Sequence, residues 1–272
     1  MDQTIGPRRY RTVFLSDIHL GARECQAELL LDFLRHMSCE RLYLIGDIVD
    51  GWKLRRGWHW PQAHNDVVQK LLRLARKGAR VTYVPGNHDD RVRDFCGVHF
   101  GGVEVAREAV HETADGRRLL VVHGDEFDGL VRGAAWRSIA GDLAYKAVIA
   151  LNTLIAGARR RLGLSYWSLS AALKGSLARA RAFVETFEES AAAEAARRGL
   201  DGVVCGHIHR AALREVGGVT YANDGDWVES CTALVEHMDG RLEIVDWAAL
   251  RARYMIRSTP HSLEELIEPA PA

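Results

Sequence analysis

Side chains that can bind divalent metals recur at five places in this 272-residue chain, each just after a short apolar segment. They offer carboxylate, imidazole and amide oxygen ligands, which suit metals such as Mn, Fe or Zn. No cysteine lies among them, which disfavours a structural zinc site. The candidate ligands are Asp17, His19, Asp47, Asn87, His123, His207 and His209.

Seven such ligands are enough for two metals. Two metals about 3.5–4 Å apart need a bridging ligand, and a carboxylate serves well. They would polarise phosphoryl oxygens and lower the pKa of a bridging water, giving a hydroxide for in-line attack on a phosphoester. His88, next to Asn87, is placed to give a proton to the leaving oxygen. A single Asp-x-His or Gly-Asp pair is commonly structural, but five blocks in this order favour a bimetal hydrolase.

The apolar segments before these residues have the composition of buried strands. Three of them lie at Thr12–Ser16, Arg41–Ile45 and Arg80–Val84. Helical patterns at about Gln26–Met37 and Gln62–Lys77 separate them. This alternation predicts an α/β fold with parallel strands. Ligand sites in such sheets lie beyond the carboxyl ends of the strands, so the five loops are expected to converge.

The second half of the chain contains a predicted insertion. Residues from about 130 to 198 are rich in alanine, contain no proline and have an almost wholly helical pattern. Strand-like segments precede and follow them. We therefore predict one domain over residues 1–258, interrupted by a helical cap at about 130–198, with residues 259–272 as a loosely held tail.

The order of the polar motifs resembles that of the calcineurin-like metallophosphoesterases, whose pattern is DxH, GD, GNH(D/E), a His and GHxH. Every element is present between Asp17 and His209. The resemblance implies a four-layer αββα sandwich of two mixed sheets and two metals, most often Mn, with Fe or Zn as alternatives. It also implies a bridging role for Asp47. One metal would be held by Asp17, His19, Asp47 and His209, and the other by Asp47, Asn87, His123 and His207.

Two further polar positions have alternative interpretations. In similar enzymes, a carboxylate at the position of Asp50 orients the catalytic histidine, here His88, through a hydrogen bond. The alternative is a carboxylate that only stabilises a turn. The segment Asn223–Trp227 is interpreted as a tight turn, with a role in lining the site as the weaker alternative.

The residues next to the motifs help to distinguish between classes of substrate. Protein phosphatases of this superfamily carry arginines where this chain has Gly51 and Pro85, so a phosphoprotein substrate is disfavoured. The run from Gly46 to Trp52 is instead similar to that of the UDP-2,3-diacylglucosamine pyrophosphatases. That resemblance implies cleavage of a pyrophosphate in a nucleotide-linked lipid, giving UMP and a lipid phosphate. The chain departs from the best-studied members in having His88 where they have arginine.

The predicted cap is strongly basic. Nine basic residues and one acidic residue between Val131 and Arg181 give a local charge of +8, although the whole chain has 36 residues of each sign. An apolar run at 147–156 lies in the same stretch. Together they favour an anionic lipid substrate or peripheral contact with an anionic membrane. The alternative is a helical hairpin that packs on the core with a solvated basic face. Lys174 and Arg179 are the predicted phosphate contacts.

Tryptophans follow the second motif. Trp52 and Trp58 lie shortly after Asp47 and are predicted to stack on a base or sugar of the substrate. The alternative is that at least one tryptophan of the group that includes Trp60 packs in the core.

Composition limits the possible partners and the cellular location. The balanced charge argues against nucleic acid as a partner. Scattered cysteines without a CxxC pair indicate reduced thiols, and no apolar run approaches the roughly 18–20 residues of a membrane span. A cytoplasmic location is predicted, with peripheral association on the inner face of the membrane as a refinement. Competing functions are a phosphodiesterase for cyclic nucleotides or other small diesters, and a non-catalytic metal-binding scaffold. Oligomeric state is not indicated.

Overall fold

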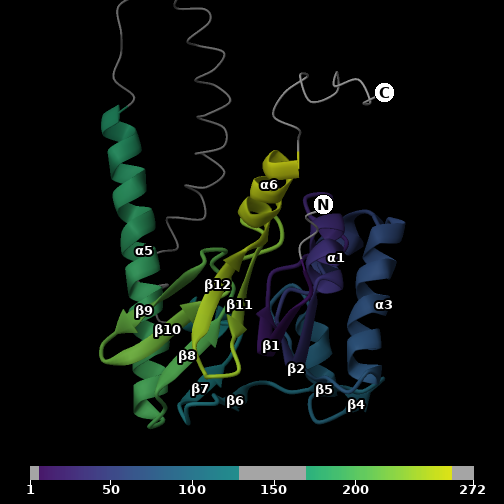
Figure 1. The fold of residues 1–272 in the computed structure, drawn as a ribbon. Helices are drawn as coiled ribbons and strands as arrows, with labels where there is room; N and C mark the ends of the chain where they lie inside the picture. Colours follow the sequence, from purple (N-terminus) through teal and green to yellow (C-terminus); the bar gives the residue numbers. More distant parts are fainter. Residues whose placement is uncertain (1–5, 129–169, 259–272) are drawn as a thin grey trace, which may run out of the picture.

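The computed structural model describes the backbone of residues 6–128 and 170–258 and the side chains of residues 6–128 and 181–254. Residues 129–169, which include the first part of the cap predicted at about 130–198, and the predicted tail at 259–272 lie outside the described residues, as do the side chains of Lys174 and Arg179. The described chain forms two β-sheets that lie face to face, with helices on both outer sides (Figure 1).

The first sheet contains seven strands, namely β1 (Arg8–Leu15), β2 (Met37–Ile45), β3 (Arg80–Val84), β4 (His99–Phe100), β5 (Val103–Val105), β11 (Thr232–Glu236) and β12 (Leu242–Asp246). Their spatial order is β12-β11-β1-β2-β3-β5-β4. The pairs β1–β2, β2–β3 and β3–β5 are parallel, as the alternation of strands and helices predicts. The outer pairs are antiparallel, so the sheet is mixed.

The second sheet contains five strands, namely β6 (Ala109–Glu112), β7 (Arg118–Val121), β8 (Gly202–Cys205), β9 (Ala212–Val216) and β10 (Val219–Asn223). Their spatial order is β6-β7-β8-β10-β9. The central pairs β7–β8 and β8–β10 are parallel, whereas β6 and β9 pair antiparallel at the two edges.

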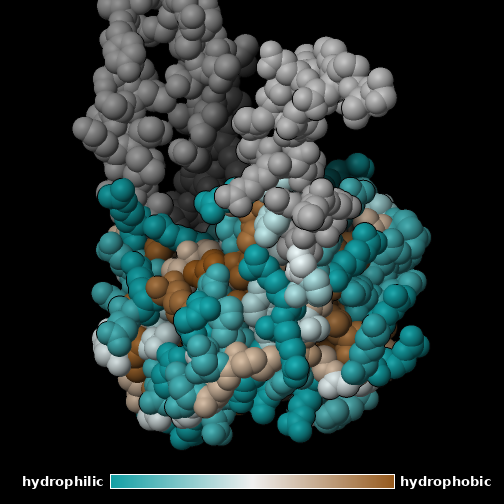
Figure 2. Space-filling model, in the orientation of Figure 1, coloured by the Kyte–Doolittle hydropathy of each residue, from teal (hydrophilic) through white to brown (hydrophobic). Residues whose placement is uncertain are grey.

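The helices are α1 (Ala27–Arg35), α2 (Gly51–Arg56), α3 (Gln62–Arg76), α5 (Ser170–Arg197) and α6 (Trp247–Ser258), with short 3-10 helices η1 (Asp90–Phe95) and η2 (Asp125–Phe127). In Figure 1, α1 and α3 cover the first sheet on one side, and α5 covers the second sheet on the other. On the face drawn in Figure 2, hydrophobic surface gathers between α5 and α6. Within the described residues, no helix combines the length and apolar character needed to cross a membrane.

Successive residues of the central strands face different layers. Phe14 of β1 lies between the two sheets, whereas its neighbour Val13 faces α1 and α3. In the second sheet, Val204 lies between the sheets, and Val203 packs against Phe187 of α5. Both faces of each sheet are therefore buried, which is the reason the strands are apolar throughout. The predicted αββα arrangement of two mixed sheets is confirmed.

Two local features differ from the prediction. The first helix was expected to continue to about Met37, but it ends at Arg35 and Met37 begins β2. Met37 pairs with Arg8 in the β1–β2 ladder, so sheet pairing outweighs the local helical pattern. The short helix α2 was not predicted. It begins directly after Asp50, whose side chain accepts a hydrogen bond of 2.8 Å from the backbone N–H of Lys53.

Candidate metal centre

The ligand loops lie at one edge of the two sheets. In the first sheet, Asp17, Asp47 and Asn87 follow β1, β2 and β3. In the second sheet, His123 and His207 follow β7 and β8. The strands within each of these sets run parallel, so their carboxyl ends meet at the same edge. The motifs spread over 193 residues of sequence are thereby brought into one cluster.

Asp17, His19 and His209 form one group of ligand atoms. Oδ1 of Asp17 lies 3.1 Å from Nε2 of His209 and 3.8 Å from Nε2 of His19. The two imidazole nitrogens are 3.3 Å apart. Oδ1 of Asp17 is buried and makes no hydrogen bond with any described residue. A buried carboxylate oxygen that faces two imidazole nitrogens needs a cation, so this group fits a divalent metal.

A second group contains Asp47, Asn87 and His123. Nε2 of His123 lies 3.2 Å from Oδ1 of Asn87 and 3.5 Å from Oδ1 of Asp47. The other oxygen of Asp47, Oδ2, faces the first group and lies 3.8 Å from Nε2 of His19. The ring of His207 packs beside that of His123, with centroids 5.1 Å apart. Since its two oxygens face different groups, Asp47 has the geometry of a bridging ligand, and the clusters fit a binuclear site.

Hydrogen bonds on the far side of each ring orient the histidines. Nδ1 of His123 lies 2.9 Å from the carbonyl oxygen at the end of β2, and Nδ1 of His19 lies 3.1 Å from Oδ2 of Asp50. Each Nδ1–H donates, which leaves Nε2 of both rings to face the clusters. In His207 the two nitrogens have the opposite roles, since its Nε2 lies 3.0 Å from Oδ1 of Asp128 and its Nδ1 is the nitrogen left to bind a metal. Such outer partners set the tautomer that a metal ligand needs.

The backbone of the ligand loops is strained. Among the described residues, six non-glycine residues have a left-handed φ, and five of them are predicted ligands: Asp17, His19, Asp47, His207 and His209. This conformation costs an L-residue about 1–2 kcal/mol and is concentrated at functional sites. The strain therefore supports the assignment of these loops to the site independently of the side chains.

Two motif glycines leave room for the ligands. A Cβ on Gly86 would collide with Oδ1 of Asp47 and lie 2.7 Å from Nε2 of His123. A Cβ on Gly206 would collide with the side chains of Ser16 and Asp17. The glycines of the GNH and GHxH motifs thus allow the backbone to pass close to the ligand side chains.

His88 lies beside both groups. Its Nε2 is 3.9 Å from Oδ2 of Asp47, and its Nδ1 is 3.1 Å from Oδ1 of Asp50. Asp50 is buried, and its carboxylate also accepts the hydrogen bond that caps α2. The indole of Trp52 stacks on the His88 ring with centroids 4.1 Å apart and is 45% exposed. This arrangement leaves an aromatic surface available beside His88.

The other tryptophans lie apart from this contact. Trp58 is 77% exposed and its ring packs on that of Trp60, with centroids 6.1 Å apart. Trp60 in turn packs against the first hydrophobic core, so the core-packing alternative applies to Trp60. The structure places Trp52, rather than Trp58, against the residues of the site.

The carboxylates and imidazoles shift one another's pKa strongly. Burial would lower the pKa of His123, but a hydrogen bond with Asp47 and the charges of Asp17 and Asp47 raise it to about 10. Burial would raise the pKa of Asp17, but His209 and His123 hold it below its usual value. Charge pairing therefore outweighs desolvation. The cluster needs positive charge, which protons on the imidazoles or divalent metals can supply.

Metal binding is expected to strengthen as the pH rises. A metal binds neutral imidazole, and the pKa of His123 in the metal-free site is about 10, so binding displaces a proton at every pH below that value. The affinity for Mn²⁺ should rise about tenfold per pH unit for each proton released. Calorimetric titrations between pH 6 and 8, in buffers of different ionisation enthalpy, measure both the Mn²⁺ affinity and the number of protons released. An affinity that is independent of pH, without proton release, would contradict this account.

Asp89 connects two ligand loops and was not singled out from the sequence. Its carboxylate accepts hydrogen bonds from the backbone N–H of Ile48 at 2.8 Å and of Gly86 at 2.6 Å, and from the hydroxyl of Tyr83. Burial raises the pKa of Asp89. The signal was available, because Asp89 is the acidic residue that ends the GNHD motif.

The segment Asn223–Trp227 supports the site from behind. The side chain of Asn223 donates to the carbonyl oxygen of Gly206 at 2.6 Å. The hydroxyl of Ser16 lies within hydrogen-bonding distance of both Asp17 and Asp224. Asn223 and Asp224 are buried, so the segment holds the ligand loops in place and does not line the open side of the site.

The chain is similar in sequence to known proteins. Residues 10–211 match the calcineurin-like phosphoesterase family. The UDP-2,3-diacylglucosamine hydrolase of Xanthomonas campestris pv. campestris is 30% identical over 241 residues, which cover 84% of this chain and 96% of the relative. That of Stenotrophomonas maltophilia is 28% identical over 236 residues, with coverages of 82% and 93%. Among solved structures, the E. coli phosphoesterase Yfce has a TM-score of 0.40 at 17% identity, with coverages of 86% and 98%.

The family match spans most of the chain, and every predicted ligand from Asp17 to His209 lies within it. The ligand clusters have the donor types that two divalent metals require. The chain therefore belongs to the calcineurin-like phosphoesterases, a family of metal-dependent hydrolases.

Proposed function

We propose that the protein hydrolyses a pyrophosphate bond in a nucleotide-linked lipid such as UDP-2,3-diacylglucosamine, giving UMP and a lipid phosphate. The observation that carries this proposal is the similarity over 84% of the chain to proteins named UDP-2,3-diacylglucosamine hydrolase. The arrangement of Asp47 between two ligand groups supports the same chemistry.

The metals are proposed to be two Mn²⁺ ions, with Fe or Zn as alternatives. When bound, they supply Lewis acidity toward phosphoryl oxygens and an activated water. Asp47 connects the two groups, and Asp50 and Asp128 hold the rings of His19 and His207. The proposed ligands are Asp17, His19, Asp47 and His209 for one metal, and Asp47, Asn87, His123 and His207 for the other.

His88 is proposed to hold the proton for the leaving oxygen. Burial would lower its pKa, but Asp50 and Asp47 raise it above the usual value, so the imidazolium form persists to a higher pH than in a free histidine. Asp50 lies at Nδ1, which directs Nε2 toward the side of Asp47. The proton would thus be held at Nε2, beside the carboxylate that faces both ligand groups.

The surroundings of His88 favour a nucleotide or sugar over a phosphoprotein. A Cβ on Gly51 would lie 2.8 Å from the carbonyl oxygen of His88, so an arginine at this position would require the backbone to move. The half-exposed indole of Trp52 offers a flat surface on which a base or sugar ring can stack. Lys174 and Arg179 remain the predicted phosphate contacts from the cap.

A membrane-borne substrate defines a location. The acyl chains of a nucleotide-linked lipid lie in a bilayer, so we place the protein in the cytoplasm with peripheral contact to the inner face of the membrane. The basic segment Val131–Arg181 is the proposed contact, because anionic lipids attract such a charge.

The test is Mn-dependent release of UMP from UDP-2,3-diacylglucosamine by protein stripped of metal and then reconstituted. We expect release that requires metal and is absent in the Asp47→Ala variant. Bis-p-nitrophenyl phosphate, run in parallel, reports general diester hydrolysis. Turnover of this probe without UMP release would refute the lipid substrate and direct the search to other diesters. No turnover of either compound by protein that holds two metals would refute the proposed reaction.

A further inference from the structure

A salt bridge between Arg93 and Asp125 connects the two sheets beside the metal centre. Arg93 lies on η1, which follows β3 of the first sheet, and Asp125 begins η2, which follows β7 of the second sheet. Nη2 of Arg93 lies 2.7 Å from Oδ1 and 2.9 Å from Oδ2 of Asp125. The same nitrogen lies 3.2 Å from the carbonyl oxygen of Pro85. One nitrogen therefore joins a ligand loop of each sheet.

The salt bridge is next to two members of the second ligand group. Pro85 lies two residues before Asn87, and Asp125 lies two residues after His123. Asn87 and His123 come from different sheets, and Oδ1 of Asn87 lies 3.2 Å from Nε2 of His123. A metal held by both atoms requires that the two loops keep this spacing. Arg93 connects the same two loops, so it can fix the distance between these ligands.

Two other contacts near this group act differently. Asp89 binds the backbone N–H of Gly86 and of Ile48, which both belong to ligand loops of the first sheet. His123 reaches the first sheet through its own ring, whose Nδ1 lies 2.9 Å from the carbonyl oxygen of Ile45. The side chain of Arg93 differs from both, because it connects loops of the two sheets and is not a candidate ligand.

Partial burial gives this salt bridge a defined geometry. The side chains of Arg93 and Asp125 are 32% and 15% exposed. Charge-assisted hydrogen bonds are shorter and stronger than neutral ones, and a partly buried pair is screened less by salt than an exposed pair. Arg93 is thus suited to hold a loop in position, as partners behind a metal ligand commonly do.

We propose that Arg93 is a positioning residue for the second ligand group, which it maintains by tying the Asn87 loop to the His123 loop. The inference rests on the proposed assignment of two metals and not on the identity of the substrate. The hydrogen bonds of Arg93 go to Asp125 and to a backbone carbonyl rather than to a ligand side chain. Its effect is therefore on the spacing of the second group, and the first group should not depend on it.

The sign of the effect separates positioning from simple electrostatics. A guanidinium near a divalent metal repels it, so loss of the Arg93 charge alone would strengthen metal binding. Loss of the Asp125 charge alone would weaken it. If the pair positions the loops, both Arg93→Met and Asp125→Asn should weaken binding of the second metal, by about 10–100-fold. The double variant should lose no more than the single variants, because each substitution breaks the same link.

Arg93→Lys provides a conservative replacement. All three contacts of Arg93 come from one nitrogen, and a lysine ammonium carries three N–H donors that can make them too. Arg93→Lys is therefore expected to bind the second metal more tightly than Arg93→Met does.

Arg117→Met is the matched control. The side chain of Arg117 is 34% exposed, and its Nη2 also binds a carboxylate, that of Asp115 at 2.8 Å, and a backbone carbonyl, that of Gly240 at 3.0 Å. Arg117 lies in the turn between β6 and β7, at the end of β7 away from His123. Its substitution removes the same kinds of contact far from the ligand loops.

The test is titration of metal-stripped protein with Mn²⁺, followed by electron paramagnetic resonance. The signal of free Mn²⁺ counts the bound ions, and spin coupling between neighbouring ions reports that both sites are filled. Asn87→Ala is the reference for loss of the second metal. We expect Arg93→Met and Asp125→Asn to bind one Mn²⁺ like the wild type and the second about 10–100-fold more weakly. Arg117→Met should match the wild type at both steps.

Three outcomes would overturn the positioning role. Stronger binding in Arg93→Met together with weaker binding in Asp125→Asn would show that the pair acts through its charge. Equal weakening of both metals, or the same loss in Arg117→Met, would show a general effect on the fold, which thermal unfolding of the metal-free proteins measures directly. If Arg93→Met does not fold, Arg93→Lys and Asp125→Asn decide the question.

Failure of the proposed function gives a different pattern. Selective loss of the second metal in Arg93→Met, without UMP release by the wild type, would support the positioning role and refute only the nucleotide-lipid substrate. UMP release by the wild type, with both metal affinities unchanged in the variants, would overturn the positioning role and leave the reaction intact. A wild type that binds a single Mn²⁺ would refute the assignment of two metals and the positioning role with it.

Discussion

Asp47→Ala is expected to remove both metals and to lower kcat/KM by at least about 10³-fold. The two oxygens of Asp47 face different ligand groups, with Oδ1 3.5 Å from Nε2 of His123 and Oδ2 3.8 Å from Nε2 of His19. Oδ1 also accepts a hydrogen bond of 2.8 Å from the backbone N–H of His88. Alanine would therefore remove the shared ligand and release the loop that carries the proposed acid.

Metal content by mass spectrometry and initial rates with bis-p-nitrophenyl phosphate measure this effect. Asp94→Ala is the matched control, because Asp94 is an exposed acidic residue of η1. The control should retain two metals and full activity. If Asp47→Ala still held two metals with wild-type affinity, Asp47 would not be the bridge, and the assignment of the two ligand groups would have to be revised.

His88→Gln is expected to lower kcat by about 10²–10⁴-fold for a substrate with a poor leaving group, the range typical of a lost general acid. The loss should be much smaller for a p-nitrophenyl ester, because p-nitrophenolate leaves readily without a proton. This dependence on the leaving group separates proton donation from a structural role. Metal content should stay at the wild-type value, since His88 is not among the proposed ligands.

Rates with a nucleotide diphosphate substrate and with a p-nitrophenyl diester provide the comparison. His99→Gln is the matched control, because His99 is an exposed histidine on β4. Asp50→Asn adds a second measurement. Since Asp50 helps to raise the pKa of His88, its removal should lower that pKa and move the alkaline limb of the kcat profile to lower pH. Equal losses for both substrates in His88→Gln would show that His88 does not donate the proton.

The metal-free protein has a substitute for the missing positive charge. Imidazole and carboxylate groups lie close together within the cluster, and their pairing raises the pKa of His123 and lowers that of Asp17. Removal of metal therefore leaves buried charges that are paired with one another, which is less costly than leaving them isolated. The ligand loops can keep their positions for metal to bind again, with protons leaving as the metals enter.

The ligands could be predicted from the sequence because each motif is local. A buried strand followed by a short polar loop is recognisable within about six residues, and the order of the loops along the chain determines which strands carry ligands. Asp17, Asp47 and His123 were identified in this way, and the structure places all three in one cluster. The parallel sheet was predictable for the same reason, since strands alternate with amphipathic helices at short spacing.

The tertiary structure decided what depends on contacts between distant residues. Met37 begins a strand because it pairs with Arg8, although its local pattern is helical. The hydroxyl of Ser16 meets Asp224, 208 positions further along the chain.

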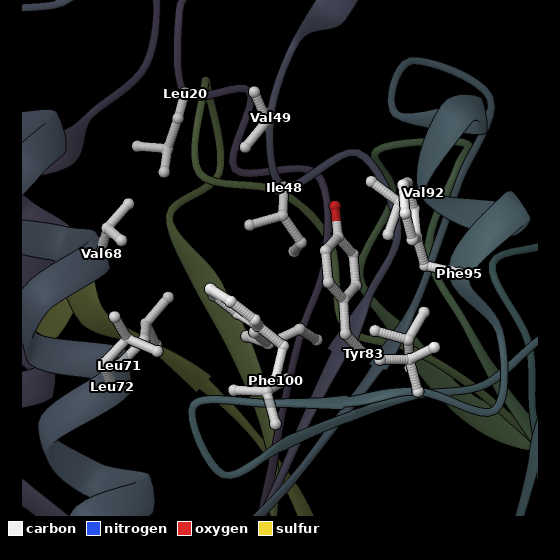
Figure 3. Close-up of a pocket in the computed structure, with 14 residues that line it drawn as sticks. Leu20, Ile48, Val49, Val68, Leu71, Leu72, Tyr83, Val92, Phe95 and Phe100 are labelled. Carbon is white, nitrogen blue, oxygen red and sulfur yellow. The ribbon is translucent and has the colours of Figure 1, made fainter.

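The apolar pocket drawn in Figure 3 has the same origin. Its lining comes from two ligand loops, α3, β2, β3, β4, β5 and the η1 region, which lie far apart in the sequence. Short-range sequence patterns predict which segments form strands or helices and which of their side chains face the core. Packing alone determines whether side chains from separate segments close against one another or leave a space between them.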